Sequence, residues 1–89
     1  LPMSILEAMA YSTAVISTPV GGIPSLIDSG TNGLLAAPGD VDALAAAMRR
    51  YICNPAEARE HARRARATVE PYYIDRVTAA LAELYRTLV

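Results

Sequence analysis

The sequence has no lysine: its eight basic residues are all arginines, and nine acidic residues give a net charge of -1. A chain with this balance has no overall attraction for a polyanion, so we predict no nucleic-acid partner. The single cysteine, Cys53, cannot form an internal disulfide and suits a reducing compartment. No apolar run approaches the roughly 20 residues needed to cross a bilayer, so we predict no transmembrane helix.

Metal-ligating and nucleophilic side chains are also scarce. His61 is the only histidine, and no acid accompanies it at the spacing of a zinc site, so we predict no metal and a solvated imidazole. Cys53 has no histidine placed to act as its base, which favours a packed or half-buried thiol over a nucleophile. Four arginines interleaved with acids indicate a salt-bridged outer face, with an anionic-membrane patch as the alternative. They are Arg59, Arg63, Arg64 and Arg66.

Charge is nearly absent from the first third of the chain, where Glu7 is the only charged residue before Asp28. Apolar residues around it recur at helical spacing, and Pro2 and Ser4 suit a first helical turn. The amides near Met3 and Ser4 can receive an anion, and Glu7, about one turn further on, can accept hydrogen bonds from ligand hydroxyls. This pairing suits a sugar nucleotide, and a solvent-facing helix acid is the alternative.

The order of the predicted elements indicates an α/β fold with a parallel sheet. A helix at 3–11 precedes a β-branched strand at 14–18, and a short helix at 23–27 precedes a second strand at 33–37. Two strands alone leave edges and faces uncovered. We therefore expect the rest of the sheet to lie upstream of Leu1.

The second half is predicted to be helical, which gives two short strands and about five helices in all. Asp40 is a good N-cap for a helix at 41–53, whose apolar face we expect to pack on the sheet. Residues 54–57 resemble a capping box and begin a helix that Pro71 ends, and a last amphipathic helix covers 72–89. The apolar faces comprise Leu44, Met48, Tyr51 and Ile52 in the first of these helices and Ile74, Val77, Leu81, Leu84 and Leu88 in the last.

Four motifs in order resemble the donor-binding half of the group 1 family of GT-B-fold, retaining glycosyltransferases. They are LPMSILEAMA at 1–10, VISTPVGGIP at 15–24, DSGTNGLL at 28–35 and PGD at 38–40. The resemblance implies the C-terminal, Rossmann-like parallel-sheet half of a GT-B enzyme. The family's hallmark is a pair of glutamates separated by seven residues, and Glu7 matches the second. The first would precede Leu1, so we expect residues 1–89 to be a partial nucleotide-sugar-binding domain truncated on its N-terminal side.

The resemblance also implies roles for particular residues. Glu7 would hold the nucleotide ribose, and the helix start would face the donor sugar and diphosphate through its backbone. That start comprises Leu1, Pro2, Met3 and Ser4. Gly21 and Gly22 are weaker candidates for a pocket wall, with a plain strand-to-helix turn as the alternative. No residue of the chain matches a catalytic role, so we expect the isolated chain to be inactive.

The implied parent enzyme transfers a hexosyl group from a nucleotide-sugar donor to a hydroxyl of a carbohydrate, lipid or other acceptor, with retention. Helix-start amides stabilise the departing diphosphate, so neither a metal nor another cofactor is expected. The helix at 72–89 would pack back toward the N-terminal domain of the same enzyme. The implied location is cytoplasmic, with peripheral association at the inner membrane face as a variant. A related sugar-nucleotide epimerase and a non-catalytic nucleotide-binding or assembly remnant are the alternatives.

Three positions depart from the family pattern. Ser12 stands where glycine is usual after the first helix, Ala14 where proline is common and Ser25 where glutamate is common. A non-glycine residue in a left-handed helix cap costs up to about 1 kcal/mol, so Ser12 is predicted to strain that cap. Asn32-Gly33 predicts a turn and no more.

Overall fold

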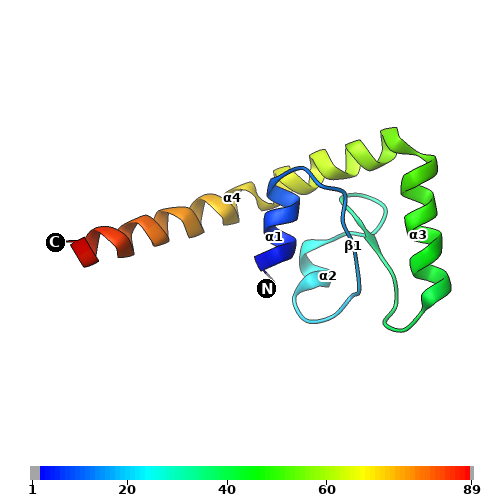
Figure 1. The fold of residues 1–89 in the computed structure, drawn as a ribbon, viewed down its shortest axis with the longest axis horizontal. Coiled ribbons are helices and arrows are strands. Elements are labelled where there is room, and N and C mark those ends of the chain that lie inside the picture. Colours follow the sequence, from blue (N-terminus) through cyan, green and yellow to red (C-terminus); the bar gives the residue numbers. More distant parts are fainter. Residues whose placement is uncertain (1–2, 89) are drawn as a thin grey trace.

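Two short parallel strands and four helices make up residues 3–88, the part of the chain that the computed structural model describes. The elements are α1 (Met3–Ala10), β1 (Ile16–Ser17), α2 (Ile23–Leu26), β2 (Leu34–Leu35), α3 (Val41–Cys53) and α4 (Pro55–Leu88). In Figure 1, α3 meets α4 at one end of the molecule and α1 crosses α4 near its middle, while the C-terminal half of α4 extends away from the other elements. The predicted α/β class is therefore confirmed.

The two strands pair in parallel, with Ile16 beside Leu34 and Ser17 beside Leu35. They are shorter than predicted because only a few residues of each have a partner, although backbone hydrogen bonds extend the pairing on both sides. The Leu34 N–H donates to the Val15 carbonyl oxygen at 3.0 Å. A Cβ atom at Gly33 would lie 3.1 Å from that same oxygen, so the close approach of the two segments requires glycine there.

A single apolar core joins α1, α2 and α4. Its buried side chains come from α1 (Leu6, Met9), from the segment before β1 (Val15), from α2 and its end (Ile23, Leu26, Ile27) and from α4 (Ala65, Val69). The contacts between α1 and α4 are the most extensive between any two elements of the described residues. The apolar spacing that predicts α1 thus also gives its packing face.

Helix α1 ends in a left-handed residue, as the sequence predicts. Ser12 has φ +58°, the one non-glycine residue with positive φ within residues 3–88. The Thr13 N–H donates to the Ala8 carbonyl at 3.0 Å, and the Ser12 N–H donates to the Met9 carbonyl at 3.1 Å. These two bonds form a Schellman motif, which satisfies carbonyls at the helix end but usually places glycine where Ser12 stands.

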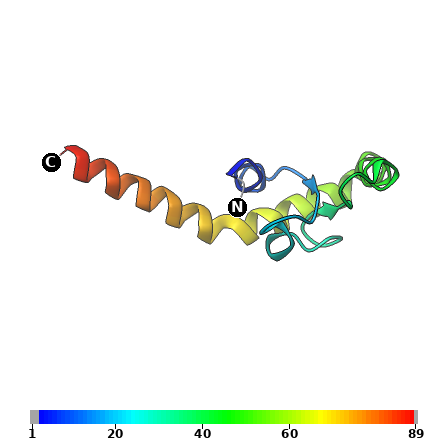
Figure 2. The same cartoon turned by 90° about the horizontal axis from the view of Figure 1, so that it is seen from below.

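The predicted helix break at Pro71 is wrong, because α4 is one helix of 34 residues with Pro71 inside it. Pro71 cannot donate a backbone hydrogen bond to the Ala67 carbonyl, and its ring crowds that carbonyl. Both residues are solvent-exposed, so water can satisfy the carbonyl. Figure 2 shows α4 changing direction gently near its middle, as a helix does when it accommodates a proline.

The C-terminal half of α4 has an apolar stripe that faces solvent. Leu81, Leu84 and Leu88 are exposed, and the side chains of Ile74 and Val77, predicted for the same stripe, lie outside those described. The extension makes the molecule 53 Å long and gives a radius of gyration of 15.3 Å. A compact chain of this size would have about 12 Å. No helix within residues 3–88 combines the length and apolar character needed to cross a bilayer.

Helix α3 contacts the sheet, but its large apolar side chains do not all do so. Asp40 caps the helix as predicted, since its Oδ1 accepts a hydrogen bond from the Ala43 N–H at 2.9 Å. Ala47 is buried, whereas Leu44 and Met48 are about half exposed and Ile52 is 75% exposed. The prediction that α3 packs on the sheet is therefore confirmed, although Leu44, Met48 and Ile52 of its predicted apolar face stay exposed.

The predicted capping box at the start of α4 does not form. Glu57 instead accepts two hydrogen bonds from the Arg50 guanidinium, at 2.6 and 2.9 Å, across the junction between α3 and α4. The Asn54 Nδ2 donates to the Arg50 carbonyl at 2.9 Å, so this side chain closes α3 rather than opening α4. The hydrogen bond from Arg50, with the positive charge of its guanidinium as a smaller cause, holds the pKa of the Glu57 carboxyl below its ordinary value.

Candidate functional site

Glu7 lies on the outward face of α1. Its neighbours Leu6 and Met9 are buried in the core, while the Glu7 side chain is exposed to solvent. Within residues 3–88, no ion pair or side-chain hydrogen bond of the structure uses the Glu7 carboxylate. An acid fixed on a packed helix, with its oxygens in solvent, can accept hydrogen bonds from a ligand.

The start of α1 is the second part of the predicted site. Leu1 and Pro2 lie outside the described residues, and the helix begins at Met3, with the Ser4 side chain exposed. The first helical turn contains no acidic residue. The backbone N–H groups of that turn have no acceptor within the helix, and no side-chain charge of α1 neutralises the positive end of its dipole. This end of α1 therefore suits an anion.

The Gly21-Gly22 loop leads into α2, whose residues share the core with α1. Gly21 has φ +56°, and Gly22 is the N-cap residue of α2, which has no side-chain cap. The Ser25 Oγ donates to the Gly22 carbonyl at 2.7 Å, so this residue, which departs from the family pattern, has a local structural bond. Contact between the loop and a ligand stays a prediction.

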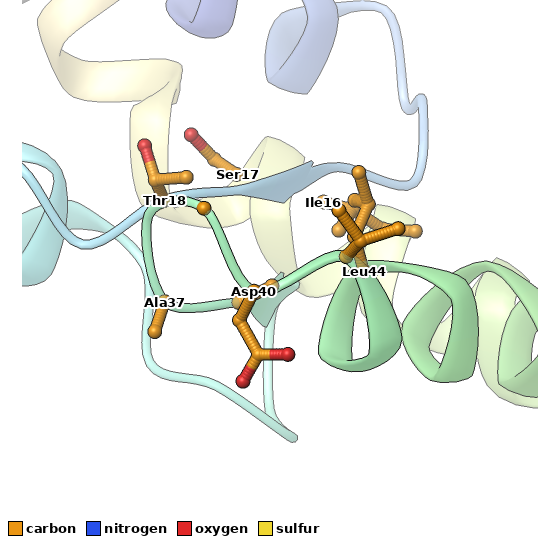
Figure 3. Close-up of a pocket in the computed structure, with 9 residues that line it drawn as sticks. Ile16, Ser17, Thr18, Ala37, Asp40 and Leu44 are labelled. Atoms are coloured by element: carbon orange, nitrogen blue, oxygen red, sulfur yellow. The ribbon is translucent and has the colours of Figure 1, made fainter.

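A pocket that the sequence analysis missed lies at the carboxyl ends of β1 and β2 (Figure 3). It encloses about 340 Å³. Its walls are mostly apolar, and in Figure 3 the Ser17 and Thr18 hydroxyls point away from the Asp40 carboxylate. The polar groups therefore do not converge on one ligand position. The lining residues are Ile16, Ser17, Thr18, Ala36, Ala37, Gly39, Asp40, Val41 and Leu44.

This pocket includes neither Glu7 nor Ser4 nor the Gly21-Gly22 loop. The structure thus places Met3, Ser4 and Glu7 on α1 and the Gly21-Gly22 loop just before α2, apart from the cavity between the strand ends and α3. A signal for the cavity was present in the sequence. The predicted strands at 14–18 and 33–37 each end immediately before a proline, Pro19 or Pro38. The carboxyl ends of parallel strands share one edge of a sheet, where α/β proteins often have a crevice.

The predictions for His61 and Cys53 need correction. His61 is 2% exposed rather than solvated, and its Nδ1 lies 2.8 Å from the Tyr51 hydroxyl of α3. Burial, the main cause, raises the pKa of Tyr51 to about 12, so this tyrosine stays neutral at physiological pH. Cys53 is exposed at the end of α3 rather than packed. Within residues 3–88, no group of three His, Cys, Asp or Glu side chains could hold a metal ion.

Two arginines of the predicted outer face form ion pairs. Glu60 accepts hydrogen bonds from Arg63 at 2.6 and 3.0 Å and from Arg64 at 3.1 Å. The hydrogen bond from Arg63, followed by the charges of both arginines, lowers the pKa of Glu60 to about 2. The pairing supports the salt-bridged interpretation of this surface for Arg63 and Arg64.

Comparison with known proteins identifies the family. The profile of the family described as "Glycosyl transferases group 1" matches residues 1–54. The amylovoran biosynthesis glycosyltransferase AmsK of Erwinia amylovora is 36% identical over 99% of this chain, which covers 22% of that protein. A glycogen synthase of Mycobacterium tuberculosis (strain ATCC 25618 / H37Rv) is 36% identical over 90% of the chain, which covers 20% of it.

A solved structure agrees with the sequence comparison. The sucrose-phosphate synthase of Thermosynechococcus elongatus superposes with a TM-score of 0.79 at 34% identity, over 99% of this chain and 22% of that protein. The chain spans about a fifth of the length of the curated relatives it matches. The family match, the curated relatives and the shared GT-B architecture lead to one conclusion: the chain belongs to the group 1 family of glycosyltransferases.

Proposed function

We propose that this chain is the donor-binding part of an enzyme that transfers a hexosyl group from a nucleotide sugar to an acceptor hydroxyl, with retention of configuration. The observation that carries the proposal is the combination on α1 of an uncompensated helix start and an exposed Glu7, held in place by the buried opposite face of the same helix. The relatives named above and a lipopolysaccharide core mannosyltransferase of Rhizobium leguminosarum act on different saccharides. We therefore propose only the class of donor, with a carbohydrate or lipid hydroxyl as acceptor.

In this proposal, each part of the site has a separate task. The Glu7 carboxylate accepts hydrogen bonds from the ribose hydroxyls of the donor. The backbone of residues 1–4 faces the sugar and diphosphate, and its amides stabilise the negative charge that develops on the departing diphosphate. Gly21 and Gly22 form one wall of the pocket. Because amides perform the electrostatic task, we propose that donor binding needs no metal ion.

The second part of the proposal concerns the surroundings of the site. We propose that residues 72–88 pack against an N-terminal domain of the same enzyme, because the leucine stripe of α4 is exposed in this chain. We place the enzyme in the cytoplasm, at the inner membrane face when its acceptor is a lipid. A single, exposed cysteine suits the reducing conditions there.

The proposal is tested by titrating UDP, GDP and ADP into the whole protein and its Glu7→Ala variant, with and without EDTA. Loss of hydrogen bonds to a charged acceptor should weaken binding of the preferred nucleotide about 10- to 100-fold. EDTA should leave the dissociation constant unchanged. Glu83→Ala, which removes an exposed acid near the C-terminal end of α4, is the control. Equal affinity in the Glu7→Ala variant and the wild type would remove this residue from the site.

A further inference from the structure

Asn32 is a buried polar residue whose side-chain groups all have partners. It is 6% exposed, although sequence analysis assigns it only to a turn. Its Oδ1 accepts a hydrogen bond from the Asp28 N–H at 2.8 Å, and its Nδ2 donates to the Leu26 carbonyl and to the Thr68 Oγ1, each at 3.1 Å. One side chain thus joins the end of α2, the loop that follows it and the middle of α4.

This connection matters because α2 cannot hold its own position. It has four residues, little more than one turn, and an isolated helix of that length is unstable in water. Its place depends on the buried side chains of Ile23 and Leu26 and on the bond that Asn32 makes to its last carbonyl. Asn32 therefore fixes the element that the Gly21-Gly22 loop enters.

Thr68 carries the connection to the donor-binding helix. Its hydroxyl donates to the Arg64 carbonyl at 2.9 Å and accepts from Asn32, so its proton and one lone pair are both used. Ala65 and Val69, its neighbours on α4, are fully buried in the core cluster that contains Leu6 and Met9 of α1. The same short stretch of α4 thus supports α1 through apolar packing and the loop after α2 through hydrogen bonds.

We infer that Asn32 and Thr68 are positioning residues for the donor site, which set the place of the Gly21-Gly22 wall relative to Glu7. The inference rests on the proposed function. Neither residue touches the donor. Their effect is to hold α1 and α2 against the same stretch of α4, so that the helix start and the loop are in place before a nucleotide binds. Such preorganisation raises affinity because less ordering is needed on binding.

The test compares two threonines of α4 that make the same local bond. Thr68 and Thr87 each donate from Oγ1 to the carbonyl four residues earlier at 2.9 Å, but only Thr68 also accepts a hydrogen bond from Asn32 among the described contacts. Thr68→Val and Thr87→Val therefore remove the same helix bond, and Thr68→Val alone breaks the connection. Thr68→Ser, which keeps the hydroxyl, is the rescue variant.

Nucleotide dissociation constants are measured for the whole protein at a temperature where thermal unfolding shows each variant fully folded. We expect Thr68→Val to weaken binding of the preferred nucleotide about three- to tenfold, while Thr87→Val and Thr68→Ser stay within about twofold of wild type. Asn32→Ala should weaken binding at least as much as Thr68→Val. If Thr68→Val fails to fold, the nucleotide affinity of Asn32→Ala, compared with that of the Thr87→Val control, decides the inference.

The outcomes separate this inference from the proposed function. Wild-type affinity in Thr68→Val and Asn32→Ala, with reduced affinity in Glu7→Ala, would overturn the positioning role and leave the donor site standing. A lower unfolding temperature with unchanged affinity would also overturn it, because a purely structural bond has that effect. Failure of the wild type to bind UDP, GDP or ADP would overturn both.

Discussion

Ser12 places a non-glycine residue in the left-handed position that ends α1. A Cβ atom in that conformation is unfavourable, so Ser12→Gly should stabilise the protein by about 0.5–1 kcal/mol, even though glycine gains entropy in the unfolded chain. Urea unfolding measures the change as a higher midpoint with an unchanged slope. The Schellman bonds of the Ser12 and Thr13 N–H groups are backbone bonds, so the substitution keeps them.

The matched control reverses the change at Gly21, whose φ is nearly the same as that of Ser12. Gly21 has φ +56° and nothing within 4 Å of an added Cβ, so Gly21→Ser should destabilise the protein through the backbone alone. If both substitutions shift stability in the same direction, the left-handed conformation is not the cause.

Glu60 gives the protein a pH dependence at low pH. Its pKa falls from the ordinary 4.5 to about 2 in the folded state, because the charged form is bonded to Arg63 and Arg64. The stabilisation is therefore complete above pH 4.5 and is lost as the pH falls toward about 2. Glu60→Gln should reduce the loss of stability across this window, as measured by urea unfolding at several pH values.

Salt provides the check on this electrostatic cause. The pair is exposed, so 1 M NaCl should narrow the difference between wild type and Glu60→Gln. Glu83→Gln, which disrupts the longer Arg86–Glu83 pair of 3.3 Å, should alter the acid slope less. An equal acid slope in wild type and Glu60→Gln at low salt would contradict the assignment.

At the scale of elements, α4 keeps its helical course through a residue that usually ends helices. Pro71→Ala would restore a hydrogen bond to the Ala67 carbonyl and relieve the crowding of that carbonyl. We expect the free energy of unfolding to rise by about 1–3 kcal/mol. The upper end is the full difference in helix propensity between proline and alanine, and the gain should not exceed it because the helix already bends to accommodate the ring. Thermal unfolding followed by circular dichroism at 222 nm measures both the midpoint and the helical signal.

Pro55 is the internal control for this substitution. It occupies the first residue of the same helix, where the missing N–H would have no helical acceptor. Pro55→Ala should therefore change stability by no more than about 0.5 kcal/mol. A fall in midpoint for Pro71→Ala would mean that the bend itself is needed for stability.

The elements also show which structural features local sequence patterns predict and which they do not. Periodicity and capping residues predict α1, α3 and the strands, because these signals act over a few residues. The same rules assign a break at Pro71 and a capping box at Glu57, and both are wrong. In each case a competing contact or solvent access decides: exposed carbonyls tolerate the proline, and Arg50 on a different helix takes the Glu57 carboxylate.

At the scale of the whole molecule, the extended half of α4 is the largest feature without a tertiary partner in the described residues. Leu84 is 52% exposed there. If an N-terminal domain covers this stripe in the whole enzyme, Leu84→Ala should destabilise it by about 2–5 kcal/mol, the usual range for a buried leucine. Glu83→Ala, one residue away on the same turn, is the control and should stay within about 0.5 kcal/mol. If Leu84→Ala and Glu83→Ala change the free energy of unfolding by the same small amount, the stripe faces solvent in the whole enzyme as well.

The sequence by itself determined the α/β class and the family, and it predicted the candidate site. Helical spacing around a single early acid, glycine and proline turns, and four ordered motifs are local properties, so they are legible without a structure. Glu7 could be predicted as exposed because its neighbours Leu6 and Met9 have the spacing of a buried helix face. The direct contact of Glu7 with a donor stays a prediction of the resemblance.

Only the tertiary structure decided which polar residues are buried and what they join. Asn32 and His61 look like a turn residue and a surface residue in the sequence, yet both are buried and bonded to residues of another element. Thr68 lies 36 residues from Asn32 in the sequence. Tyr51 lies ten residues from His61 and on a different helix. No local sequence pattern therefore indicates either pairing. Burial of a polar group depends on the packing of several elements at once, and for that reason no short window of sequence can specify it.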